Sequence, residues 1–159
     1  MFKIAYGAGH YMGTAGKRLA KELDATETRE WVLNDRVARY FAEAAKEYIG
    51  VELLRVDDST GKAEVALATR CKRANDWGAD LCLAIHHNAG INLGSGGGIV
   101  AYSYKDGTTG AKYRDAIYNA CIGSFSSITG SCTTSFFSGA KGVFLRYGEP
   151  GNRLYLPSE

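Results

Sequence analysis

One stretch constrains the fold of this chain more than any other: five apolar residues, Leu81 to Ile85, lead directly into His86, His87 and Asn88. A continuous apolar run of this length is typical of a strand buried in a parallel sheet. Open α/β sheets bind their ligands beyond the carboxyl ends of such strands. The stretch therefore predicts a buried strand that carries imidazoles, which bind protons and metals, to the mouth of a cleft.

The third histidine of the chain, His10, occupies a similar position near the N-terminus. It follows a short apolar segment, residues 2–6, and a Gly-Ala-Gly turn. We expect residues 2–6 to form the first and central strand of the sheet. Because the chain has 3 histidines in all, two that follow predicted strands suggest a shared site.

Helices and strands alternate along the first three quarters of the sequence. Apolar residues spaced by three and four predict a helix over residues 29–49, which Gly50 ends. The other predicted elements are helices over 63–77 and 109–122 and strands over 51–56, 81–85 and 99–104. This alternation implies right-handed βαβ units, and therefore an α/β fold with an open, mostly parallel twisted sheet flanked by helices.

The pattern becomes irregular after residue 122. Residues 124–139 have no clean period, whereas 142–147 are predicted to form a last strand and 154–156 another short one. No internal repeat or linker interrupts the chain. We therefore expect a single domain over residues 1–159, with an atypical or shortened C-terminal part.

Composition excludes several classes of function. Hydrophobic residues make up 45% and charged residues 23% of the 159 positions, which is typical of soluble globular proteins. The net charge of +2 is too small to indicate nucleic-acid binding. No apolar run approaches the roughly 18 residues that a membrane span requires. The cysteines form no Cys-x-x-Cys pair and are expected to be small buried hydrophobic residues: Cys71, Cys82, Cys121 and Cys132.

A carboxylate at the start of the first long helix completes a candidate metal site. A catalytic zinc ion takes three protein ligands and keeps a fourth position open, and histidine nitrogens and carboxylate oxygens are suitable donors. His10 and His86 follow adjacent strands, and Glu30 lies in the first turn of the helix, one turn before Asn34. Each has a simpler explanation on its own, because strand-end histidines form loop hydrogen bonds and first-turn glutamates interact with the helix dipole.

Three motifs together resemble a known family. They are Gly-x-Gly-His near the N-terminus, Glu-Trp-Val-Leu-Asn at the first long helix and Ala-Ile-His-His-Asn-Ala at a strand end. Their order and spacing resemble the zinc-dependent N-acetylmuramoyl-L-alanine amidases with an open α/β sheet, found in wall-remodelling enzymes and phage endolysins. The resemblance covers about residues 2–122. It implies zinc ligands at His10, Glu30 and His86, with His87 at a variable position.

The resemblance also implies a reaction and a substrate. The family hydrolyses the amide between N-acetylmuramic acid and L-alanine in peptidoglycan, using a metal-activated water and a carboxylate that carries its proton to the leaving amine. The implied partners are the muramic acid and stem peptide of the wall, with no nucleic acid and no membrane span, and we expect a monomer. A chain without a signal peptide would be made in the cytoplasm and reach the bacterial cell wall after phage lysis or leaderless export.

The late part of the sequence departs from the family pattern. The family draws its catalytic carboxylate from a late strand, apolar-apolar-Glu-x-Gly-Phe, and Arg146 stands at the glutamate when residues 143–148 are aligned with it. An alternative alignment places residues 152–156 before that strand, so that the chain would end too early. Glu149 is the nearest acidic candidate for the catalytic role.

Two other functions stay open beside the amidase. One is a zinc-containing peptidoglycan-binding module with lost or impaired turnover, because the catalytic glutamate is not identifiable. The other is phosphate binding by the glycine-rich loop at residues 7–10. That loop lacks the Lys-Ser/Thr of a P-loop and the third glycine of a dinucleotide site, so the motif is weak.

Overall fold

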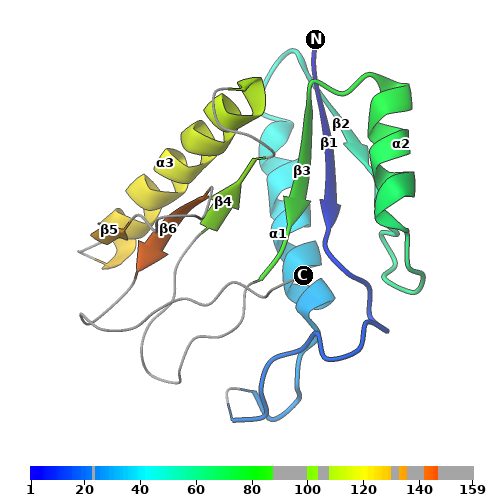
Figure 1. Ribbon diagram of the computed structural model, residues 1–159, viewed down its shortest axis with the longest axis vertical. Helices are drawn as coiled ribbons and strands as arrows, with labels where there is room; N and C mark the ends of the chain where they lie inside the picture. The colour runs from blue at the N-terminus through cyan, green and yellow to red at the C-terminus, as the bar shows by residue number, and fades with distance from the viewer. Residues whose placement is uncertain (23, 88–99, 104–107, 130–132, 136–141, 147–159) are drawn as a thin grey trace. The chain divides into compact units, whose positions relative to one another are not determined.

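The computed structural model of the chain describes residues 1–22, 24–87, 100–103, 108–129, 133–135 and 142–146 (Figure 1). The chain divides into two compact units, Met1–Asn88 and Ala89–Glu159. The elements of the first unit are β1 (Phe2–Ala8), α1 (Glu30–Ala45), β2 (Val51–Arg55), α2 (Leu67–Trp77) and β3 (Leu81–Ile85). Those of the second are β4 (Val100–Tyr102), α3 (Thr109–Thr129), β5 (Thr133–Ser135) and β6 (Gly142–Arg146).

A three-stranded parallel sheet in the order β2-β1-β3 forms the centre of the first unit. The predictions of an open parallel sheet and of a central first strand are therefore confirmed. The register pairs Ala8 with Ile85, so β1 and β3 end at the same level of the sheet. His10 and His86 follow these two strand ends. The parallel pairing thus brings both histidines to the same edge.

Two helices cover opposite faces of this sheet. Successive side chains of β1 point to opposite faces, so neighbouring residues of this strand contact different helices. Ala5 packs with Val56 and with Ala74 of α2 in the buried core. Tyr6, the next residue, contacts Phe41 of α1 with 5.5 Å between the ring centroids. The helices therefore fix the central strand from both sides.

A buried ion-pair network joins α1 to the end of β2. The guanidinium of Arg55 donates to Asp35 at 2.7 Å and to Asp57 at 2.8 Å. Asp35 and Asp57 are only 7% and 6% exposed. Hydrogen bonds to Asp57 raise the pKa of Arg55 despite its burial, with Asp35 adding to the effect. Charges buried in this way are tolerated because each has a hydrogen-bonded partner of opposite sign.

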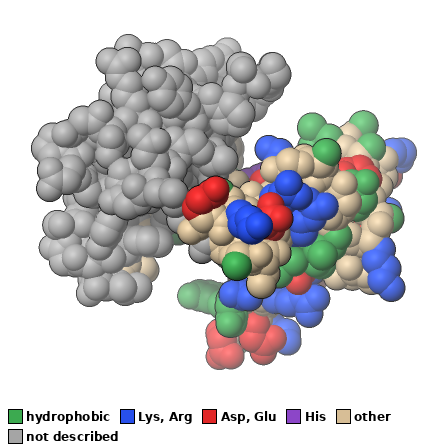
Figure 2. Space-filling view, turned by 90° about the horizontal axis from the view of Figure 1, so that it is seen from below, with side chains coloured by type: hydrophobic (Ala, Val, Ile, Leu, Met, Phe, Trp, Pro, Cys, Tyr) green, Lys and Arg blue, Asp and Glu red, His purple; other side chains and the backbone are tan. Residues whose placement is uncertain are grey.

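Most predicted elements of the first unit are confirmed, with shifted ends. α1 stops at Ala45, ahead of Gly50, whose φ is 86°. α2 begins at Leu67 rather than at residue 63, because Ala63 takes part in a turn that the Asp58 carboxylate organises. Charged side chains of both signs are spread among apolar ones over the described surface in view (Figure 2), in keeping with the small net charge.

The expected burial of the cysteines is wrong for two of them. Cys71 and Cys82 are exposed and Cys121 is partly buried, and all three are free thiols. β3 is an edge strand of its three-stranded sheet, and its burial alternates, so Cys82 lies on the exposed face between two partly buried leucines. Among the described residues of the first unit, the apolar run 81–85 therefore forms a strand covered on one face, not on both as we expected. Cys132 lies outside the described residues.

The second unit has an antiparallel sheet in the order β4-β6-β5. β6 confirms the predicted late strand and pairs Phe144 with Val100 and Arg146 with Thr133. β5 was not predicted, and residues 154–156 lie outside the described residues. α3 runs to Thr129, past the predicted end at 122, because serine and phenylalanine lower helix propensity only slightly and no proline interrupts the segment.

Across the described ranges, no helix combines the length and the apolar character that a membrane span requires. The expectation of a single domain over residues 1–159 stays a prediction.

Candidate metal centre

His10 follows β1 in a backbone conformation that non-glycine residues seldom adopt, with φ at 61°. Arg70 of α2 stabilises this turn. Its guanidinium donates to the carbonyls of Ala8 at 2.6 Å and of His10 at 3.2 Å, and its Nε donates to Val65 at 2.8 Å. Strained residues held by their surroundings cluster at functional sites, so the geometry of His10 points to a functional role for this turn.

Glu30 is the first residue of α1, and its carboxylate lies at the positive end of the helix dipole. The backbone N–H of Glu30 donates to the carbonyl of Lys17 at 3.0 Å, which fixes the start of the helix. The Glu30 side chain is largely buried. The carboxylate is thus presented from a rigid element.

His86 comes immediately after β3, and the backbone of Gly9 lies against its ring. The N–H of Gly9 donates to the carbonyl of Ile85 at 2.8 Å, which extends the pairing of β1 and β3 by one bond. A Cβ on residue 9 would fall 2.1 Å from Cε1 of His86. Glycine is therefore required at position 9 for the His86 ring to keep its place.

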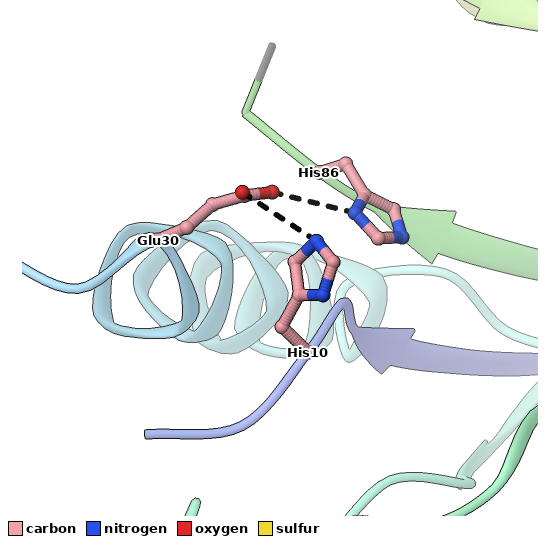
Figure 3. Close-up of side chains that lie close together, drawn as sticks. All are labelled: His10, Glu30 and His86. Carbon is pink, nitrogen blue, oxygen red and sulfur yellow. Dashed lines mark hydrogen bonds and ion pairs between the residues drawn. The ribbon is translucent and has the colours of Figure 1, made fainter. Parts of the chain in front are cut away.

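The three side chains converge (Figure 3). Nε2 of His10 lies 3.5 Å from Oε2 of Glu30, and Nδ1 of His86 lies 3.3 Å from Oε1. The rings of His10 and His86 meet edge to face with centroids 4.9 Å apart. One ligand atom from each of the three residues lies within 4.8 Å of the other two. The structure thus brings together all three residues that the sequence suggested as donors.

This arrangement fits a zinc ion. Two ligand atoms that each lie about 2.1 Å from one tetrahedral zinc ion are about 3.4 Å apart. The two nitrogen–oxygen separations, 3.3 and 3.5 Å, are close to that value, and each runs to a different oxygen of the Glu30 carboxylate. Two imidazoles and one carboxylate are also a donor set that catalytic zinc sites use, with a fourth position open.

The protonation states favour metal binding as well. Burial lowers the pKa of His10, so the imidazole is mainly neutral at pH 7. Burial alone would raise the pKa of Glu30, but hydrogen bonds to its carboxylate, first that of His86 and then that of Asn34, help to outweigh it and lower that pKa. Neutral imidazole and ionised carboxylate are the forms that bind metal ions.

His87 faces Asn34 of α1, and its Nδ1 lies 2.7 Å from Oδ1 of the amide. The backbone N–H of His87 also donates to Oε1 of Glu30 at 3.2 Å. Burial lowers the pKa of this imidazole. His87 is therefore engaged beside the donor cluster through both its ring and its backbone.

The proposed catalytic carboxylate is beyond what the structure describes. Glu149 lies outside the described residues, and Arg146 is the last residue of β6, opposite Thr133. Sequence reasoning missed Arg70, since an arginine in a helix gives no sign that it will bind distant backbone carbonyls. The glycine before His10 was visible in the Gly-x-Gly-His motif, but its contact with His86 was not.

The sequence matches the N-acetylmuramoyl-L-alanine amidase family (Amidase_3) over residues 5–129. The chain belongs to this family. Over 77 residues this chain is 39% identical to the sporulation-specific N-acetylmuramoyl-L-alanine amidase of Bacillus subtilis (strain 168). The match covers 48% of this chain and 28% of that protein. The chain thus spans less than a third of the length of this curated relative.

Two solved amidase structures have a similar fold. One is the catalytic domain of an N-acetylmuramoyl-L-alanine amidase from Bacillus (Paenibacillus) polymyxa var. colistinus, with a TM-score of 0.59, 21% identity, and coverage of 82% of this chain and 65% of that one. The other is the N-acetylmuramoyl-L-alanine amidase from Clostridium difficile 630, with a TM-score of 0.58, 20% identity, and coverage of 79% and 63%. These similarities confirm the α/β fold class.

Proposed function

We propose that this protein is a zinc-dependent N-acetylmuramoyl-L-alanine amidase that hydrolyses the amide between N-acetylmuramic acid and L-alanine in peptidoglycan. Membership of the amidase family supports the reaction class. The observation that carries the proposal is the convergence of His10, Glu30 and His86, whose ligand atoms lie within 4.8 Å of one another. The substrate is the muramic acid and stem peptide of the bacterial cell wall.

The three donors would hold the zinc ion, and when bound it supplies Lewis acidity to a carbonyl oxygen and lowers the pKa of a water molecule. His10 and His86 would each contribute an imidazole nitrogen, and Glu30 would contribute a carboxylate oxygen. These donors come from two strand ends and a helix start, so the parallel pairing of β1 with β3 and the packing of α1 support their convergence. Amide hydrolysis further requires a group that takes a proton from water and gives it to the leaving amine.

Glu149 is the candidate for that proton transfer, as the acidic residue nearest the point where the family has its glutamate. Replacing it by glutamine should abolish turnover and leave zinc content unchanged, since the donors lie elsewhere. Arg146→Glu tests the first alignment, in which residues 143–148 match the late strand of the family pattern. An increase in turnover for Arg146→Glu, with no loss for Glu149→Gln, would overturn the assignment of Glu149.

The first experiment measures zinc and activity together. Purified protein should hold about one zinc ion per molecule, and purified walls should gain free L-alanine amino termini in a chelator-sensitive manner. His10→Ala and His86→Ala should abolish zinc binding. Glu30→Gln should weaken zinc binding and turnover, whereas the same change at Glu43, exposed on the same helix, should affect neither. Stoichiometric zinc in both histidine variants would remove the proposed site.

A second function is favoured by one observation: when residues 143–148 are aligned with the family pattern, Arg146 stands at its glutamate. A cation at that position cannot accept a proton from water. The alternative is therefore a zinc-containing module that binds peptidoglycan without cleaving it. Binding to walls together with no release of L-alanine amino termini, in protein loaded with zinc, would support this alternative and contradict the amidase.

A further inference from the structure

Asn34 is a polar residue buried completely in the interior of the first unit. It lies on α1, one turn after Glu30, and its exposed fraction is 0%, the lowest of any large side chain in the described residues. A buried amide costs free energy unless its donors and acceptor are hydrogen-bonded. The partners of this amide therefore indicate what its burial achieves.

Its hydrogen bonds reach all three segments that carry the candidate metal donors. Nδ2 donates to the carbonyl of Gly9 at 3.0 Å, directly before His10, and to Oε1 of Glu30 at 3.4 Å. Oδ1 lies 2.7 Å from Nδ1 of His87, directly after His86. One side chain thus touches the turn after β1, the start of α1 and the segment after β3.

The chemistry of these partners fixes which end of the amide faces which group. The carbonyl of Gly9 can only accept a hydrogen bond, so the NH2 group must face it. Oδ1 then faces His87, and because this oxygen can only accept, Nδ1 of His87 must carry the proton. The neutral ring of His87 is thereby held with its proton on Nδ1 and a lone pair on Nε2.

We propose that Asn34 is a positioning residue, which fixes the three donor-bearing segments relative to one another and holds His87 as the Nδ1–H tautomer. Its effect on zinc binding rests on the proposed function, whereas its effect on His87 does not. Groups that form hydrogen bonds with metal-ligating residues, and so orient them, typically contribute 10–100-fold to metal affinity. Without Asn34, Glu30 and the His10 turn would have to be ordered when the metal binds, and that ordering would weaken affinity.

A matched pair of variants separates positioning from general stability. Asn34→Ala removes the amide, and Ala38→Gly weakens the same helix one turn later, at a residue that is also fully buried. Both changes should lower the stability of the fold. We expect zinc affinity, measured in the folded protein by competition with a chelator, to fall about 10–100-fold in Asn34→Ala and to stay unchanged in Ala38→Gly. Equal zinc affinity in wild type and Asn34→Ala would overturn the proposal.

A second measurement requires no metal, and its first part uses the wild-type protein alone. In ¹⁵N NMR spectra of the zinc-free wild-type protein, neutral His87 should have its proton on Nδ1, in contrast to free histidine, which favours Nε2. In Asn34→Ala the ring should revert to the Nε2–H form. A wild-type His87 protonated on Nε2 would overturn the proposal even if Asn34→Ala fails to fold. If the wild-type protein binds no zinc, the proposed function fails and this tautomer still decides the role of Asn34.

Discussion

Gly9 and His86 are in such close contact that no side chain fits between them. The backbone of Gly9 is held on both sides, by a bond to the carbonyl of Ile85 at 2.8 Å and by one from Asn34 at 3.0 Å. A methyl group on residue 9 would fall 2.1 Å from Cε1 of His86. Because the backbone of Gly9 is fixed, the imidazole of His86 must move, and this imidazole is a proposed zinc donor.

Gly9→Ala should therefore abolish or strongly weaken zinc binding while the sheet and helices persist. Chelator competition measures the affinity, and far-UV circular dichroism checks the fold. Gly123→Ala is the control, because a Cβ at this position in α3 meets nothing within 4 Å and alanine favours a helix by about 1 kcal/mol. Wild-type zinc affinity in Gly9→Ala would contradict the packing described for His86.

Arg70 is expected to matter for both stability and the His10 turn. Arg70→Gln removes its bonds to the carbonyls of Ala8 and His10 and should lower the free energy of unfolding by about 1.5–3 kcal/mol, the range for hydrogen bonds of charged groups. Urea unfolding measures this loss. The same substitution at the exposed Arg36 should cost less than about 0.5 kcal/mol. Similar losses in the two variants would show that Arg70 does not support the turn.

Replacing Arg55 in its ion-pair network should greatly lower the stability of the fold without changing the geometry of the candidate metal centre. Arg55→Met would leave the carboxylates of Asp35 and Asp57 buried without their cation, at a cost of about 3–5 kcal/mol. Arg39 also pairs with Asp35, at 2.7 Å, but its side chain is 67% exposed. Arg39→Gln should therefore cost less than about 1 kcal/mol.

Urea unfolding gives both values for the Arg55 network, and the two variants should keep wild-type zinc affinity as long as they are folded. Equal losses in the two variants would contradict the buried role of Arg55.

Asp58 should make the turn after β2 sensitive to acid. Backbone N–H groups of Thr60, Ala63 and Lys62 donate to its carboxylate and lower its pKa to about 2. Since the pKa is depressed in the folded state, the stabilisation is present above the unfolded pKa, near 4, and is lost as the pH falls toward 2. The stability difference between wild type and Asp58→Asn should thus shrink over this range. A carboxyl ¹³C titration with a midpoint near 4 would contradict it.

The sheet of the first unit was predictable because its strands are short apolar runs separated by helical periods. The same pattern could not reveal that β3 is an edge strand, since the apolar run 81–85 contains no polar residue to mark the exposed face of Cys82. β5 is Thr-Thr-Ser, a sequence as common in loops as in strands, and its pairing with β6 is a non-local contact. Propensity alone cannot predict such a pairing.

The proposed donors were predictable for a different reason: imidazoles are rare in this chain, and parallel strands end at a common edge. The residues that hold the donor segments in place could not be predicted from the sequence. Asn34 and Arg70 act on backbone carbonyls of Ala8, Gly9 and His10, and carbonyl groups are the same in every residue. The left-handed conformation of His10 was equally hidden, because the hydrogen bonds that accompany it come from Arg70, which is distant in the sequence.

The parallel pairing of β1 with β3, Ala8 opposite Ile85, also sets the order of events during folding. Parallel strands cannot be joined by a tight turn, so β1 meets β3 only after the intervening α1, β2 and α2 have been synthesised. Such non-local contacts form slowly. A nascent chain offers His10 and Glu30 before His86 is made, and two donors hold a metal weakly. The proposed metal capture would therefore be a late step that reports the completion of the sheet.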